Sequence, residues 1–182
     1  MIVVGITGGI ASGKSFVINR LRIKNIKTHE SDKVVSEIYR KANNKFLIFL
    51  SRVGFKTAIK NKKIDKAVVR SLIFNNEYKK TKLEKFIHKE VQIERNKFLK
   101  KNKKEKIIFL EIPLLFEKKL EKLCDYSCVT IAPMSIREKR FLQRKGSNKK
   151  IFKKIVKNQT TDKIRKNKSN YIIKTNYSKK QT

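Results

Sequence analysis

Apolar residues along this chain follow two patterns that predict different elements. Charge-free runs rich in β-branched residues predict buried strands over residues 2–7, 107–110, 126–131 and 171–173, with a weaker strand over 25–29. Between these runs, apolar positions recur at three- and four-residue spacing, which predicts amphipathic helices. Strands that alternate with helices in this order predict an α/β fold around a parallel sheet, with ligands bound at the carboxyl ends of the strands.

The helical pattern is concentrated in two parts of the chain. The first covers residues 33–100, has a polar turn at 60–63, and ends with a long amphipathic segment from Tyr78 to Lys101 that contains no Gly or Pro. The second covers residues 135–170. We expect the tail from Tyr177 to Thr182 to be disordered and the 182 residues to form one domain.

A glycine-rich loop follows the first predicted strand and precedes a predicted helix. Glycines let successive backbone N–H groups and the positive end of a helix surround a polyphosphate. In this kind of loop Lys14 reaches the β- and γ-phosphates, and the Ser15 hydroxyl binds Mg²⁺. The alternative is a turn that binds nothing; because pattern and context are both satisfied, we predict a nucleoside triphosphate site. Its residues match G-x-x-x-x-G-K-[ST] at every position: Gly8, Gly9, Ile10, Ala11, Ser12, Gly13, Lys14 and Ser15.

Basic residues far outnumber acidic ones, with 48 Lys and Arg against 15 Asp and Glu and a formal net charge of +33. Such an excess can indicate nucleic-acid binding. Here the lysines are spread through the whole chain, which favours a solvated basic surface, so we expect no specific nucleic-acid partner. No apolar run approaches the ~20 residues that cross a bilayer, and the start does not read as a leader. We therefore expect a cytoplasmic protein with no membrane partner.

Three further residues fit phosphoryl transfer. The sequence lacks the D-x-x-G and N-K-x-D patterns of GTPases, which leaves small-molecule and nucleotide kinases as the leading class. Asp32, at the end of the second predicted strand, is a candidate base for an acceptor hydroxyl, and a helix N-cap is an equally good interpretation. Arg140 and Arg144, one turn apart on a predicted helix, suit a lid over the polyphosphate, with a solvated basic face as the alternative.

With these residues assembled, the chain resembles the dephospho-CoA kinase family over essentially its whole length. The resemblance rests on the opening Gly5 to Ser15, on Asp32 followed by a helix, and on an ordered set of residues further along. That set consists of Ile64-Asp65, Ile73-Phe74, Leu83-Glu84, His88, Pro113-Leu114-Leu115-Phe116-Glu117, Arg140-x-x-x-Arg144, Gln159 and Asn176.

The resemblance implies a three-layer fold like that of P-loop kinases. It would comprise a core with a central parallel sheet, a helical substrate-binding subdomain at about 33–100 and a helical lid at about 137–160. The implied reaction is ATP-dependent phosphorylation of the ribose 3′-hydroxyl of dephospho-CoA, which gives coenzyme A. Two alternatives stay open: a nucleoside or nucleoside-monophosphate kinase of the same fold, or, from another class, a nucleic-acid-binding ATPase.

Pattern and resemblance together assign the catalytic and ATP-binding residues. Asp32 would act as the base towards the acceptor hydroxyl, with Lys14 and Arg140 as further catalytic residues. Arg144 would join the eight loop residues in binding ATP. We expect the protein to work as a monomer or a weak homo-oligomer.

The remaining assignments concern the acceptor and the metal. By the resemblance, Lys66 and His88 would lie with Asp32 on the acceptor side, and Lys66 stands where the family usually has Arg. Ser15 would bind Mg²⁺ directly. Glu111, at the end of the 107–110 strand, is an additional candidate for the outer shell of that ion.

Overall fold

A computed structural model gives the structure of residues 1–74 and 76–176. The tail from Tyr177 to Thr182, for which the sequence predicts disorder, lies outside these described residues. The chain divides into two compact units: the first combines Met1–Glu30 with Asn102–Thr182, and the second is Ser31–Lys101. The functional division into an acceptor-binding region and a lid remains a prediction.

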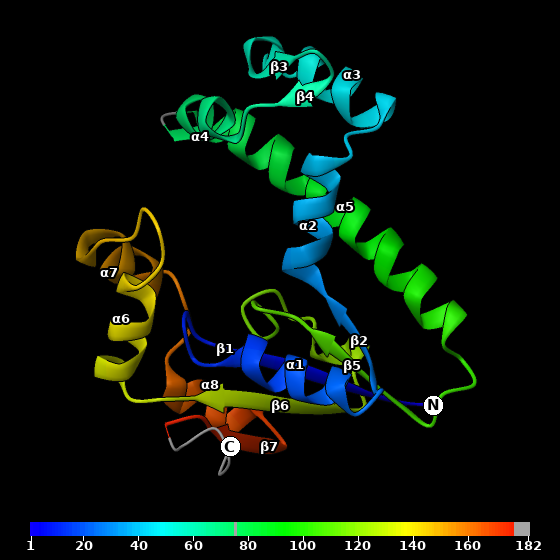
Figure 1. The fold of residues 1–182 in the computed structure, drawn as a ribbon, viewed down its shortest axis with the longest axis vertical. Helices are drawn as coiled ribbons and strands as arrows, with labels where there is room; N and C mark the ends of the chain where they lie inside the picture. The colour runs from blue at the N-terminus through cyan, green and yellow to red at the C-terminus, as the bar shows by residue number, and fades with distance from the viewer. Residues whose placement is uncertain (75, 177–182) are drawn as a thin grey trace. The chain divides into compact units, whose positions relative to one another are not determined.

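The first unit is built on a sheet in which neighbouring strands are parallel (Figure 1). This sheet confirms the predicted α/β fold. Its strands, in spatial order, are β2 (Lys27–Glu30), β5 (Ile107–Glu111), β1 (Ile2–Gly8), β6 (Tyr126–Ile131) and β7 (Tyr171–Lys174). The helices of this unit are α1 (Lys14–Ile23), α6 (Met134–Leu142), α7 (Lys149–Lys157) and α8 (Asp162–Lys168), with a 3₁₀ turn η2 (Glu121–Leu123).

Strand β1 lies at the centre of the sheet, between β5 and β6, and is buried from Val4 to Gly8. A strand covered on both faces must be nearly free of polar side chains, and the apolar run at the start of the chain meets this condition. Val17 and Ile18 of α1 join Val4 and Ile6 in one hydrophobic cluster. The central place of β1 brings the glycine-rich loop, which follows its carboxyl end, to the middle of that edge of the sheet.

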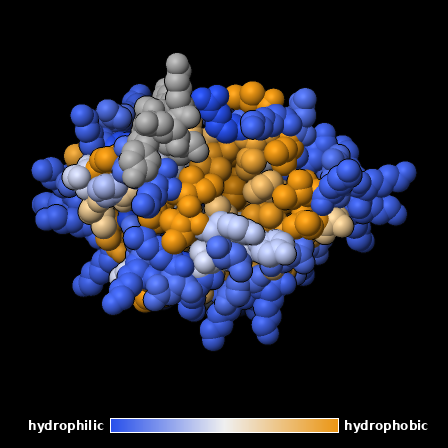
Figure 2. All heavy atoms as spheres, turned by 90° about the horizontal axis from the view of Figure 1, so that it is seen from below, coloured by the Kyte–Doolittle hydropathy of each residue, from blue (hydrophilic) through white to orange (hydrophobic). Residues whose placement is uncertain are grey.

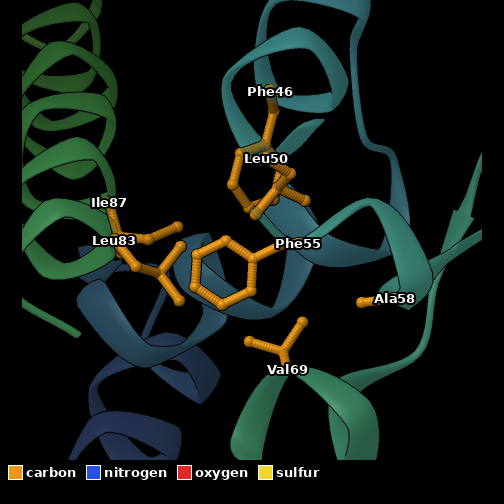
Figure 3. Packing of buried hydrophobic residues seen from close by; sticks show 7 residues of the cluster. All are labelled: Phe46, Leu50, Phe55, Ala58, Val69, Leu83 and Ile87. Carbon is orange, nitrogen blue, oxygen red and sulfur yellow. The ribbon is translucent and has the colours of Figure 1, made fainter. Parts of the chain in front are cut away.

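The second unit has its own hydrophobic core. Figure 3 shows Phe55 between Leu83 of α5 and Val69 of α4. The Phe46 ring stacks on Phe86 with centroids 5.1 Å apart, so aromatic packing holds α3 against α5. The elements of this unit are α2 (Ser31–Arg40), α3 (Asn44–Arg52), the 3₁₀ turn η1 (Lys56–Ala58), β3 (Ile59–Lys60), β4 (Lys63–Ile64), α4 (Lys66–Phe74) and α5 (Glu77–Lys101).

A short antiparallel hairpin stands where the sequence predicts only a polar turn. Ile59 pairs with Ile64 and Lys60 with Lys63. The two residues between, Asn61 and Lys62, have φ values of 48° and 61°, as the tightest hairpin turns require. Strands of two residues are too short to produce a recognisable alternation of apolar and polar positions, which is why the turn is predicted and the strands are not.

The surface is mainly hydrophilic, with apolar areas between the charged side chains. Figure 2 shows one such area in the middle of the face seen from below, surrounded by hydrophilic side chains. Exposed large side chains also occur on the edge strand β7, where Tyr171 is 57% and Ile172 47% exposed. Every lysine in the described part of the chain is exposed or half-buried, in line with the predicted solvated basic surface.

Candidate functional site

The glycine-rich loop joins β1 to α1, and two of its glycines, Gly8 and Gly13, have positive φ values. Gly13, the residue before α1, has φ of +93°, and a Cβ there would lie 2.8 Å from Thr175 Oγ1. No side chain of the described residues caps the start of α1, and its first turn has no acidic residue. The positive end of this helix therefore faces the loop unneutralised, which suits an anion.

Lys14 places its ammonium group over the same loop. Its Nζ donates hydrogen bonds to the carbonyl oxygens of Gly8, at 2.8 Å, and Gly9, at 3.2 Å. The next residue, Ser15, has an exposed side chain at the start of α1. A fixed cation, a free hydroxyl and a helix start together form a site for a polyphosphate with its counter-ion.

Two side chains from distant parts of the chain hold the tip of the loop. The Ile10 amide donates to Gln159 Oε1 at 2.9 Å, and the Ile10 carbonyl accepts from Arg137 Nε at 2.8 Å. Arg137 is only 2% exposed, and a Cβ on Gly9 would collide with its guanidinium group. The tip therefore keeps its conformation through contacts outside the motif.

An ionic network of two buried arginines and two partly buried carboxylates supports Arg137. Its Nη1 pairs with Asp162 Oδ2 at 3.0 Å, while Asp162 Oδ1 accepts from Arg165 at 3.2 Å and Arg165 donates to Glu117 at 2.7 Å. Burial lowers the pKa of Arg137, and the neighbouring Arg165 lowers it further, while Asp162 counteracts both. Charges removed from water need such partners. The network therefore stabilises the charged Arg137 guanidinium that contacts the loop.

Threonines fix the second half of the loop. Ser12 Oγ and Thr130 Oγ1 lie 2.7 Å apart, and Thr175 Oγ1 donates to the Ser12 carbonyl at 2.7 Å. A Cβ on Gly8 would collide with Thr130. The loop is therefore packed against β6 and against the residue that follows β7.

Two carboxylates stand at the ends of neighbouring strands. Glu30, the last residue of β2, is in register with Glu111, the last residue of β5, and Glu111 is also in register with Ile6 of β1. Glu111 is buried, and Glu30 pairs with Arg22 at 3.3 Å. Within residues 1–74 and 76–176, no three His, Cys, Asp or Glu residues gather as a metal cage.

The predicted acceptor residues all belong to the second unit. Asp32 is the second residue of α2 and exposed, so it lies inside the first turn and does not precede the helix as an N-cap. Lys66 begins α4, with its Nζ 5.4 Å from the centroid of the Tyr39 ring. His88 is exposed on α5. The structure thus brings Lys66 together with Tyr39, a residue that the sequence does not single out.

The two predicted lid arginines differ in their surroundings. Arg140 lies in α6 and hydrogen-bonds to Thr175. The prediction that both lie on one helix is wrong, because α6 ends at Leu142 and Arg144 follows it. The Arg144 amide donates a hydrogen bond to the Phe141 carbonyl at 3.0 Å. This bond forms a tight turn at the end of the helix. Arg144 places its guanidinium carbon 5.7 Å from the Phe141 ring centroid.

Sequence patterns did not identify several residues that shape this site. The sequence assigns no role to Arg137, Thr130, Asp162 or Thr175, because none of them matches a motif. The residue type could have pointed to the buried cations. Most basic residues of this chain are Lys, but the basic residues that the structure buries are Arg95, Arg137 and Arg165. The planar guanidinium satisfies several acceptors at once, which suits burial better than an ammonium group.

No helix in the described ranges, 1–74 and 76–176, combines the length and the apolar character that a membrane crossing requires. This agrees with the absence of long apolar runs from the sequence.

Comparison with known proteins gives one consistent result. The family model for dephospho-CoA kinase matches residues 2–181. Dephospho-CoA kinase of Fusobacterium nucleatum is 35% identical over 176 residues, or 97% of this chain and 90% of that protein, and the enzyme of Bartonella quintana is 32% identical, over 96% and 89%. The solved structure of dephospho-CoA kinase from Campylobacter jejuni superposes with a TM-score of 0.71 at 27% identity, covering 97% of this chain and 89% of that one. The chain belongs to the dephospho-CoA kinase family.

Proposed function

We propose that this protein transfers the γ-phosphoryl group of ATP to the ribose 3′-hydroxyl of dephospho-CoA, giving coenzyme A and ADP. The observation that carries the proposal is the complete glycine-rich loop, Gly8 to Ser15, which we call the phosphate-binding loop. Lys14 donates hydrogen bonds to two of its carbonyl oxygens, and no side chain of the described residues caps the start of α1 beside it. Family membership over residues 2–181 supplies the acceptor.

The transfer requires one proton movement and one exchange of phosphorus–oxygen bonds. Asp32 accepts the proton of the 3′-hydroxyl while that oxygen forms a bond to the γ-phosphorus. The bond from the γ-phosphorus to the β–γ bridging oxygen breaks, and ADP leaves with the electron pair. Lys14 and Arg140 offset the negative charge on the phosphoryl oxygens as the transition state forms.

The remaining residues bind the two substrates. Arg144 contacts the polyphosphate of ATP together with the loop residues Gly8 to Ser15. Lys66 and His88 bind dephospho-CoA on the acceptor side. The Lys66 ammonium group, held near the Tyr39 ring, provides charge for an acceptor phosphate but lacks the bidentate geometry of Arg.

Magnesium fits the residues at the start of α1. The exposed Ser15 hydroxyl would bind the ion directly, and Glu111, buried at the end of β5, would accept hydrogen bonds from its water ligands. When bound, Mg²⁺ neutralises part of the polyphosphate charge.

We also propose that the protein works in the cytoplasm, as a monomer or a weak homo-oligomer, as the sequence predicts.

An acceptor panel tests the proposal. Purified protein is incubated with Mg²⁺ and ATP, together with dephospho-CoA, nucleosides, nucleoside monophosphates, or RNA and DNA, and both ADP and phosphorylated product are measured. We expect product only with dephospho-CoA. Product from a nucleoside or its monophosphate, or ADP release stimulated by nucleic acid without an acceptor, would contradict the proposal and identify the alternative.

A further inference from the structure

One buried hydroxyl connects the phosphate-binding loop with Arg140. Thr175 directly follows β7 and is 3% exposed. Its Oγ1 donates to the Ser12 carbonyl at 2.7 Å and accepts a hydrogen bond from Arg140 Nη1 at 3.1 Å. The Thr175 carbonyl accepts a second hydrogen bond, from Arg140 Nη2. Arg140 is therefore held through both terminal nitrogens by a single residue.

Thr175 itself has a fixed position. Its amide donates to the Ile131 carbonyl at 2.9 Å, which continues the pairing of β6 with β7. Its side chain packs against Gly13, because a Cβ there would lie within 2.9 Å of the Thr175 Cβ. The sheet, the loop and the Arg140 guanidinium thus share one rigid point of contact.

We propose that Thr175 is a positioning residue for phosphoryl transfer, which sets the Arg140 guanidinium in register with the phosphate-binding loop. The inference rests on the proposed function, in which Arg140 contacts the transferring group. The two bonds to Thr175 leave the other N–H donors of Arg140 available for phosphate oxygens. Donors that are already oriented need no reorganisation in the transition state, so loss of this support lowers kcat. Loss of the Thr175 hydrogen bond to the Ser12 carbonyl weakens ATP binding as a separate effect.

A double-mutant cycle tests this coupling. The variants are Thr175→Val, which removes the hydroxyl at nearly constant volume, Thr175→Ser, which keeps it, Arg140→Ala, and Thr175→Val combined with Arg140→Ala. For each variant, kcat and KM for ATP are measured with dephospho-CoA, and thermal unfolding is measured in parallel. If Thr175→Val fails to fold, Thr175→Ala takes its place in the cycle.

We expect Thr175→Val to lower kcat by about 10-fold or more, apart from any rise in KM for ATP that follows from the lost bond to Ser12. Thr175→Ser should bring kcat back to within about twofold of the wild type. In the Arg140→Ala background, Thr175→Val should add less than about a twofold loss, because both changes remove the same interaction. An unchanged kcat in Thr175→Val overturns the inference. An equal loss in both backgrounds also overturns it, since Thr175 would then act through Ser12 alone.

The wild-type rate in the same assay distinguishes a failure of the proposed function from a failure of the role of Thr175. Turnover of dephospho-CoA that Arg140→Ala slows and Thr175→Val does not would leave the proposed function standing and overturn only the role of Thr175. Absence of wild-type turnover would overturn the proposed function and this inference together.

Discussion

Arg137 Nε and the carbonyl oxygen of Ile10 are joined by a hydrogen bond of 2.8 Å, between residues 127 positions apart in the chain. The same guanidinium group pairs with Asp162 at 3.0 Å. A backbone carbonyl at the tip of the phosphate-binding loop is thus held by a buried side chain of α6. The geometry of the loop depends on this contact as well as on its glycines.

Replacement of Arg137 by Met should damage ATP binding from outside the motif. Met retains much of the apolar stem but leaves the Ile10 carbonyl and Asp162 without their partner. We expect KM for ATP to rise about 10-fold, the factor that corresponds to a lost hydrogen bond from a charged group. The free energy of unfolding should fall by about 2 kcal/mol. Steady-state kinetics and urea unfolding measure the two effects.

Lys139→Met is the matched control, because Lys139 is an exposed cation on the same helix. It should leave KM and unfolding within experimental error of the wild type. A wild-type KM in Arg137→Met would show that the loop keeps its geometry without this contact.

Gly9→Ala should act through Arg137. The added methyl group would occupy space now filled by the guanidinium group, so either the loop or Arg137 must move. We expect ATP affinity to fall by about 10-fold or more, measured by titration calorimetry. The loss in Gly9→Ala combined with Arg137→Ala should be smaller than the product of the two single losses, because both changes disrupt one contact. Full multiplicativity would mean that Gly9 is needed for another reason.

Asp32→Asn tests the proposed base. The amide keeps the size of the side chain but cannot accept the hydroxyl proton, so kcat should fall by about 10²-fold or more. ATP binding should stay near the wild-type value, because Asp32 is assigned to the acceptor. Glu37→Gln, an exposed carboxylate on the same helix, serves as the control and should retain wild-type kcat. Unchanged turnover in Asp32→Asn would remove this residue from the mechanism.

The pair of Glu117 and Arg165 should make stability depend on pH. Burial raises the pKa of Glu117, but the N–H groups of its own backbone and of Thr160, with the Arg165 guanidinium, lower it by more, so it lies below the ordinary value of 4.5. A carboxyl group whose pKa is lower in the folded state stabilises the fold above its unfolded pKa, and this contribution is lost as the pH falls through the folded value.

We therefore expect Glu117→Gln to lower the free energy of unfolding at pH 7 by about 2 kcal/mol. Below pH 4.5 the difference from the wild type should shrink, because the wild-type carboxyl becomes protonated and loses its interaction with Arg165. Urea unfolding at a series of pH values measures this, with Glu138→Gln as a control near the surface of α6. A difference that stays constant down to pH 3 would rule out ionisation of Glu117 as its source.

The sequence by itself determined the strands of the parallel sheet, the amphipathic helices and the phosphate-binding loop. Each of these features depends on residues close together in the chain. Apolar runs indicate buried strands, and apolar positions at three- and four-residue spacing indicate helices. Gly13 has the positive φ that the loop requires. The ordered motifs from Gly5 to Asn176 also carried the family, which the comparisons confirm.

Only the tertiary structure decided the order of the strands and the support of the loop. The register of Glu30 with Glu111 depends on β5 lying between β2 and β1, which no local pattern records. The contact of Thr175 with Ser12 spans 163 positions and that of Arg137 with Ile10 spans 127. Hydrophobic periodicity reports which side of an element is buried and not which residue lies opposite, so partners at such separation emerge only when the chain has folded.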